Sequence, residues 1–227
     1  MRWRELTLAM GLGATALVTV APAPEPAHAV VASSAGEFTA VTPARILDTR
    51  KGIGAPQAPL AAAASIDVAV LGVGGVPTIG VDAVVLNVTA VKASEATFVT
   101  LWPTGGSMPV VSTLNPGGAM AVANMAVVPV GTDGKVSAYN ERGSVHLLFD
   151  VVGFYSTASG PAGSRFHAVN PFRAVDTRNG TGGIAKRSLA PGASLRFDFR
   201  NRGSLPATGM TALVLNVTAV KPTADGY

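Results

Sequence analysis

The sequence predicts an all-β protein built as a β-sandwich, with a closed β-barrel as the alternative. Short apolar stretches that alternate with polar residues recur along the chain, as expected of strands with one buried face. Turn residues separate them, and the 227 residues include 26 glycines and 16 prolines. Beyond the N-terminal segment, no window shows the period of an amphipathic helix. No threefold subrepeat is visible either, which disfavours a β-trefoil.

The first 29 residues have the features of a secretory signal peptide. Arg2 and Arg4 give a positively charged start, residues 6–20 are apolar apart from three threonines, and residues 27–29 match the small-residue cleavage pattern. The apolar stretch is shorter than the roughly 20 residues of a membrane span. We therefore expect a secreted, extracellular protein with no transmembrane segment after cleavage.

The chain has no cysteine, which excludes disulfides, zinc–thiolate clusters, thiol redox chemistry and lipoprotein anchoring. An exported protein without disulfides is more typical of bacteria than of eukaryotes. The formal net charge is +4. Because export removes the protein from nucleic acid, we expect anionic wall polymers or polysaccharides as partners instead.

One sequence unit occurs twice in the chain. Residues 38–50, FTAVTPARILDTR, return at 166–178 as FHAVNPFRAVDTR. Residues 83–92, AVVLNVTAVK, return at 212–221 as ALVLNVTAVK. Both blocks return in the same order at nearly the same separation, which indicates a duplicated domain.

The two copies differ in length. The first, residues 37–155, is complete, and a linker rich in Ser, Gly, Ala and Pro follows at 156–165. The second, residues 166–227, contains no counterpart of residues 99–155. We therefore predict one complete β domain and a truncated second copy.

The alternation of apolar and polar residues predicts where the strands of the first copy lie. Ile66, Val68 and Val70 alternate with more polar neighbours, and at the aligned positions of the second copy the apolar residues persist while the intervening ones change. We expect the last three strands to form a meander, with Asp-Gly and Arg-Gly turns between them. The expected strands are 66–70, 83–91, 97–102, 123–130, 135–140 and 145–155.

The most polar element shared by the copies is Pro-x-Arg-x-x-Asp-Thr-Arg. On a strand, Asp48 and Arg50 would share a face and pair, while Arg45 would face away. Alternatively, Asp48 caps a turn by accepting a backbone N–H. We predict a structural role for this motif, which comprises Arg45, Asp48 and Arg50 in the first copy and Arg173, Asp176 and Arg178 in the second.

Asp150 belongs with this motif. It lies in an apolar stretch, LLFDVV, where an ionised carboxylate needs a partner. We expect it to accept hydrogen bonds from Arg45 or Arg50 and so to join the last strand to the first. The second copy has no Asp150 counterpart, so Arg173 or Arg178 would lack this partner.

No catalytic site is predicted. The chain lacks the Gly-x-Ser-x-Gly, His-Glu-x-x-His and Ser-x-x-Lys patterns, and only His146 and His167 follow the predicted leader. Arginine does not transfer protons at neutral pH. We expect neither an enzyme, nor a cofactor, nor a metal site.

Trp102 is the candidate binding residue. It is the only tryptophan after the leader and precedes the turn Pro-Thr-Gly-Gly. A tryptophan at a strand end beside a glycine-rich loop can serve as a stacking platform for a sugar, or pack in the rim of the core.

Several motifs together resemble a repeat domain of secreted actinobacterial proteins. The resemblance covers the whole first copy and the first half of the second. It implies an extracellular, often tandem accessory module that accompanies hydrolase domains, and it supplies no catalytic residues. The motifs are PxRxxDTR (43–50), LNVTA (86–90), FVTLWP (98–103), STLN (112–115), AN (123–124) and DVVGFY (150–155).

From these observations we expect a secreted, non-catalytic binding or spacer module associated non-covalently with the cell surface or wall. One alternative is the accessory region of an extracellular hydrolase whose catalytic part is missing from this sequence. The other is a lectin-like protein that binds carbohydrate through Trp102.

Overall fold

The computed structural model describes residues 7–8, 16–17 and 33–224 and divides the chain into two compact units, Met1–Ala32 and Ser33–Tyr227. In the first unit, β1 (Thr7–Leu8) pairs with β2 (Ala16–Leu17) in antiparallel orientation. Apart from these two strands, the predicted signal peptide lies outside the described residues. Within the described part of the chain, no helix is long and apolar enough to cross a membrane.

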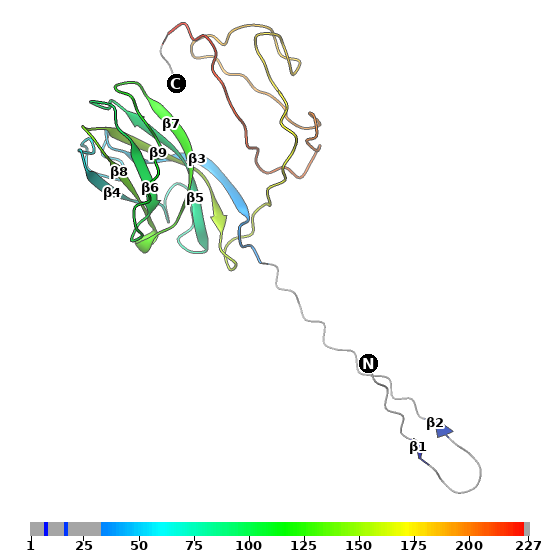
Figure 1. Ribbon diagram of the computed structural model, residues 1–227. Helices are drawn as coiled ribbons and strands as arrows, with labels where there is room; N and C mark the ends of the chain where they lie inside the picture. Colours follow the sequence, from blue (N-terminus) through cyan, green and yellow to red (C-terminus); the bar gives the residue numbers. More distant parts are fainter. Residues whose placement is uncertain (1–6, 9–15, 18–32, 225–227) are drawn as a thin grey trace. The chain divides into compact units, whose positions relative to one another are not determined.

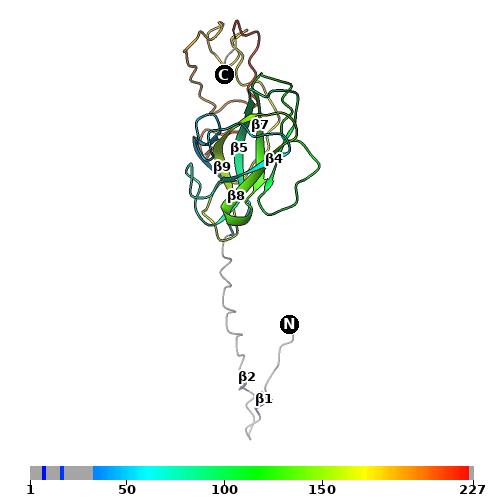
Figure 2. The ribbon, with the colours of Figure 1, turned by 90° about the vertical axis from the view of Figure 1, so that its left-hand side faces the viewer.

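The first copy is a β-sandwich of two antiparallel sheets, as predicted, and not a closed barrel. One sheet has the strand order β3-β9-β5-β7 and the other β4-β8-β6. In Figure 1, β4, β6 and β8 lie to the left of β3, β5 and β9, and Figure 2 gives the view at right angles. The strands are β3 (Phe38–Asp48), β4 (Ala64–Ala69), β5 (Val81–Val91), β6 (Val99–Pro103), β7 (Val122–Pro129), β8 (Lys135–Asn140) and β9 (His146–Ser156), with a 3₁₀ turn at Thr132–Gly134.

The core lies between the two sheets. Alternate residues of β5 and β9 point into it, because successive side chains of a strand face opposite sides. The four-stranded sheet contributes the fully buried Leu86, Val88 and Phe149, and the three-stranded sheet contributes Val99 and Val136. This alternation is the pattern from which the strands were predicted.

The predicted meander is wrong. β7 and β9 belong to the four-stranded sheet and are separated by β5, while β8 lies between β4 and β6 in the other sheet. Each of the two turns therefore crosses from one sheet to the other. A period of two shows that a strand buries one face, but it does not show which strand lies beside it.

The segment predicted as a linker packs against the first copy. Ser164 and Phe38 exchange two backbone hydrogen bonds of 2.8 Å each. The Ser34 hydroxyl donates to the Gly160 carbonyl at 2.7 Å, and the Ser156 hydroxyl donates to the Pro161 carbonyl at 2.6 Å. Residues 157–164 thus form an outer edge of the first domain.

The second copy differs from the first in its secondary structure. Its described residues, 166–224, contain no strand, although they share sequence blocks with β3 and β5. Figure 1 accordingly shows no arrow after β9.

Candidate functional site

The Asp48 carboxylate is the centre of a buried clasp at the end of β3. Its Oδ1 accepts the backbone N–H of Arg50 at 3.0 Å and the Nε–H of the same residue at 2.9 Å. Its Oδ2 accepts Arg50 Nη2 at 2.7 Å and Arg45 Nη1 at 3.1 Å. The carboxylate therefore both pairs with Arg50 and caps the turn, so the two alternatives considered from the sequence coexist.

Arg45 lies on the same side as Asp48, so the expectation that it faces away is wrong. Strict alternation would place residues three apart on opposite faces of a strand. The pairing of β3 with β9 shifts register between Arg45 and Leu47, which is a β-bulge or irregularity. An extra residue in one strand reverses the facing of the residues after it and brings the two side chains together.

Asp150 pairs with Arg45 rather than with Arg50. The guanidinium approaches both carboxylate oxygens, with Nη2 to Oδ2 at 2.9 Å and Nε to Oδ1 at 2.5 Å. The two residues are also direct cross-strand neighbours on β3 and β9. Because neighbouring β9 residues Phe149 and Val151 fill the core, Asp150 lies on the outer face of the four-stranded sheet.

Thr49, the remaining polar residue of the motif, also contacts β9. Its hydroxyl oxygen accepts the backbone N–H of Leu147 at 3.1 Å and lies 2.9 Å from His146 Nδ1. The motif thus joins the end of β3 to β9 at several points, and His146 is part of that junction.

The electrostatics of the clasp support a structural role. Hydrogen bonds from Arg50 hold the pKa of the Asp48 carboxyl far below its usual range. A carboxylate that stays ionised near neutral pH and is occupied by two arginines is unsuited to proton transfer in that range.

Acid should weaken the first domain through this clasp. Because the pKa of Asp48 is lower in the folded than in the unfolded state, its contribution is present above a pH of about 4 to 5 and is lost as pH falls below that range. Urea unfolding at pH 7, 5, 4 and 3 should show a falling free energy of unfolding. An Asp48→Asn variant should be less stable at pH 7 and show a shallower decline; an equally steep decline would contradict this origin.

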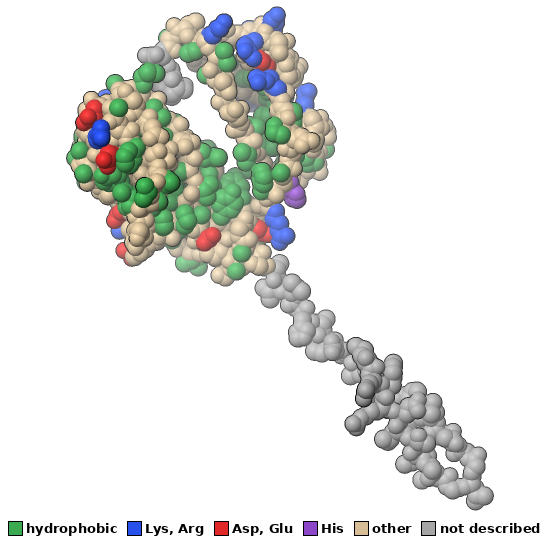
Figure 3. Space-filling model, in the orientation of Figure 1, with side chains coloured by type: hydrophobic (Ala, Val, Ile, Leu, Met, Phe, Trp, Pro, Cys, Tyr) green, Lys and Arg blue, Asp and Glu red, His purple; other side chains and the backbone are tan. Residues whose placement is uncertain are grey.

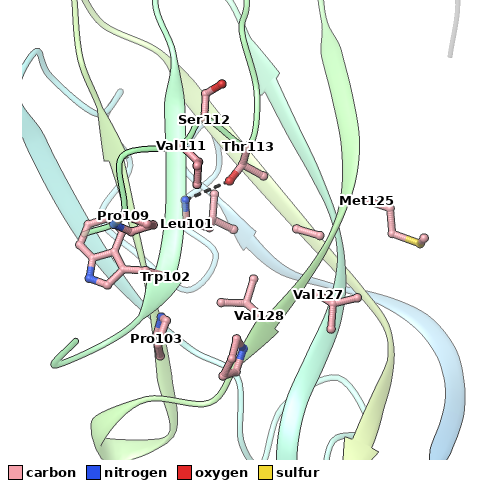
Figure 4. Close-up of a pocket in the computed structure, with 12 residues that line it drawn as sticks. Leu101, Trp102, Pro103, Pro109, Val111, Ser112, Thr113, Met125, Val127 and Val128 are labelled. Carbon is pink, nitrogen blue, oxygen red and sulfur yellow. Dashed lines mark hydrogen bonds between the residues drawn. The ribbon is translucent and has the colours of Figure 1, made fainter. Parts of the chain in front are cut away.

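A cleft lies beside Trp102, the residue predicted to bind a ligand. It has a volume of about 430 Å³ and lies where β6 and β7, edge strands of the two sheets, come near each other. Figure 4 shows Trp102 and Pro109 on one side and Met125 and Val127 on the other. Its lining comprises Leu101, Trp102, Pro103, Pro109, Val111, Ser112, Thr113, Met125, Ala126, Val127, Val128 and Pro129.

The loop after β6 shapes one side of the cleft. Thr113 Oγ1 accepts the backbone N–H of Leu101 at 3.1 Å, and the Thr100 hydroxyl donates to the Val111 carbonyl at 2.8 Å. The Trp102 indole N–H donates to the Gly106 carbonyl at 3.1 Å, which fixes the ring. With its N–H occupied, the indole presents its apolar surface rather than a donor.

The surroundings of the cleft are apolar. Figure 3 shows hydrophobic side chains gathered on the face of the first domain where Figure 1 places β5, β6 and β7. Sequence reasoning missed this loop, although several large apolar residues in a glycine- and proline-rich connection are a signal of exposure. The exposed apolar residues of the loop and of β7 are Met108, Val110, Val111, Met120, Met125 and Val127.

The remaining predicted residues lie apart from the cleft. Arg45, Asp48, Arg50 and Asp150 form the clasp at the junction of β3 and β9. In the second copy, Asp176 accepts both side-chain bonds from Arg178, and Arg173 lies 3.5 Å from Asp176. The structure thus separates the polar motif from Trp102.

No family model matches the chain, and no curated protein matches it.

Proposed function

We propose that the protein is a secreted, non-catalytic binding module and that the cleft beside Trp102 binds a cell-surface or cell-wall polysaccharide. One observation carries the proposal: a fixed tryptophan lines an open cleft of about 430 Å³ that is otherwise mostly apolar. Ligand sites commonly combine apolar walls with a few polar groups that orient the ligand.

A pyranose ring suits this surface. Its C–H face packs against an aromatic or proline ring, while its hydroxyls reach polar groups at the margin. Trp102 and Pro109 supply the apolar side, and Ser112 and Thr113 supply hydroxyls. A glycan chain enters an open cleft at the side of a sandwich more easily than an enclosed pocket.

Asp48 and Asp150 are both held in ion pairs with arginine, which supports a non-catalytic role for the polar motif. Hydrolysis of a glycosidic bond commonly needs two carboxyl groups, one of them able to donate a proton. Asp48 is held ionised by arginines, and Asp150 accepts both of its bonds from Arg45. The predicted leader and the resemblance to secreted actinobacterial modules support an extracellular site of action. Modules of that kind can accompany hydrolase domains.

The test is co-sedimentation of the purified protein with insoluble peptidoglycan and cell-wall polysaccharide, followed by fluorescence titration with soluble fragments. After leader removal, Trp102 is the only tryptophan, so its emission reports on the cleft directly. A Trp102→Ala variant should bind about 30-fold more weakly, as expected for loss of a central aromatic contact. Its melting temperature should change little, because the side chain lies at the rim.

Ile79→Ala is the matched control, because Ile79 is a large exposed apolar residue that does not line the cleft. It should bind like the unaltered protein. If the unaltered protein stays in the supernatant with every polymer, the domain acts as a spacer and the proposal is wrong. Equal retention of the Trp102→Ala variant would place binding elsewhere.

A further inference from the structure

The cleft beside Trp102 follows the free edge of β7. Among the described strands, β7 pairs with β5 alone and is the last strand of its sheet. Consecutive residues of this strand, 125–129, line the cleft, and Figure 4 shows Met125 and Val127 among them. Because successive side chains of a strand point to opposite faces, a cavity lined by consecutive residues meets the strand at its edge rather than on one face.

The pairing with β5 leaves backbone groups of Met125 and Val127 directed outward. Directly after β7, the Val130 N–H donates to the Asp82 carbonyl at 2.8 Å. Hydrogen-bonded and non-hydrogen-bonded pairs alternate along an antiparallel ladder. Met125 and Val127 lie an odd number of positions before Val130 in an unbroken register, so they belong to non-hydrogen-bonded pairs. Their N–H and C=O groups therefore point away from β5, toward the free edge.

These groups are free to bind a ligand. Among the described residues, no backbone hydrogen bond from outside the sheet reaches Met125 or Val127, and each supplies one donor and one acceptor. At the other margin, Thr113 Oγ1 accepts the Leu101 N–H, which leaves the hydroxyl proton of Thr113 to be donated. The polar groups of the cleft thus match the hydroxyls of a sugar, which both donate and accept hydrogen bonds.

The lining of the cleft carries no charge. None of the described residues that line it is Asp, Glu, Lys, Arg or His. An ionised group of a ligand would lose hydration there without gaining a charged partner, which is costly. An uncharged ligand does not meet this cost, so the lining favours an uncharged ligand.

The charge of the first domain favours the same class of ligand. Residues 37–155 contain six Lys or Arg and eight Asp or Glu, a formal excess of two negative charges. Two of the six cations, Arg45 and Arg50, are already paired with carboxylates of the polar motif. Long-range attraction of a polyanion to this domain is therefore not expected.

We propose, on the premise of the proposed function, that the ligand of the cleft is an uncharged glycan chain whose hydroxyls pair with the backbone edge of β7 at Met125 and Val127. The apolar face of a sugar packs against Trp102, and its hydroxyls reach the free N–H and C=O groups. An extended polypeptide can also pair with a free edge. Pro129, which lines the same cleft and has no N–H, shortens the ladder that such a peptide could form.

The first experiment separates cell-wall polysaccharide by anion exchange into an uncharged and an anionic fraction and measures retention of the full chain on each. The uncharged fraction should retain the protein. Its dissociation constant should change by less than about twofold between about 20 and about 500 mM sodium chloride, because no ion pair is screened. Retention by the anionic fraction alone, weakened by salt and lost in Trp102→Ala, would overturn this proposal and leave the proposed function standing. Retention by neither fraction would refute the proposed function itself.

The second experiment tests the edge of β7. Val127→Pro removes the outward N–H and leaves the pairing with β5 intact, because that N–H takes no part in it. Val127→Ala is the matched control, since it shortens the side chain and keeps the N–H. The proline variant should bind the uncharged fraction about fivefold more weakly than the alanine variant, the effect of one lost hydrogen bond. Equal binding by the two folded variants would contradict recognition by the backbone edge.

Hydrogen exchange in the unaltered protein decides the matter if the proline variant does not fold. The amides of Met125 and Val127 should exchange more slowly when the uncharged fraction is added. Unchanged exchange at both amides under saturating polysaccharide would overturn the proposal. Slowing by an unfolded polypeptide such as casein, and not by the polysaccharide, would also overturn it and assign the edge to strand addition.

Discussion

Replacing Asp48 by alanine is expected to lower the free energy of unfolding of the first domain by about 3 kcal/mol. The carboxylate is fully buried and accepts from two arginines and a backbone N–H, so its removal takes this acceptor from the Arg50 guanidinium and the Arg50 backbone N–H, whereas Arg45 keeps its pairing with Asp150. Urea unfolding followed by Trp102 fluorescence measures the loss. With a total stability of about 5–15 kcal/mol for a typical domain, the unfolding midpoint should fall well below that of the unaltered protein.

Asp198→Ala is the matched control for this substitution. Asp198 accepts the backbone N–H of Arg200 at 3.0 Å and its Nη2 at 2.6 Å, which repeats the local geometry of Asp48. It is exposed, however, so water can replace the lost acceptor. Its substitution should leave the unfolding midpoint unchanged, and equal losses for both variants would contradict the role of burial.

Replacing Phe149 by alanine is expected to cost about 4 kcal/mol, because it removes a large side chain from a closely packed core. Phe149 is fully buried on β9, the strand that lies between β3 and β5. The loss should appear in urea unfolding, with reduced strand signal in circular dichroism if the domain unfolds at room temperature.

Phe166→Ala, the same substitution at a residue that is 72% exposed, is the control. Exposed substitutions away from special features usually change stability by less than about 0.5 kcal/mol. A large loss at Phe166 would show that the second copy is packed in solution. A small loss at Phe149 would show that β9 is not the centre of the sheet.

The strands themselves could be predicted from the sequence, because the period of two reflects burial of one face and burial is local to each strand. Ile66, Val68 and Val70 illustrate this: the pattern located β4, and the last two side chains are buried. The arrangement of strands in sheets could not be predicted in the same way. The turns at 132–134 and 141–145 connect strands of different sheets, and turn residues do not specify the layer of the next strand.

Parts of both candidate sites depended on tertiary structure. The partnership of Asp150 with an arginine was foreseeable, because an ionised carboxylate in an apolar strand needs one. That Arg45 rather than Arg50 fills this role depends on the irregular register of β3, which has no marker in the sequence. Trp102 was identified from its position at a strand end, but the cleft depends on the loop after β6 lying against β7.

The most direct test of the account compares polysaccharide retention and stability in two variants of the full chain. We predict that Trp102→Ala loses retention and keeps its melting temperature, whereas Asp150→Asn keeps retention and melts at a lower temperature, because Asp150 joins β9 to β3. Loss of retention in the Asp150→Asn variant while it remains folded, with normal retention by Trp102→Ala, would contradict the account and place binding at the polar motif.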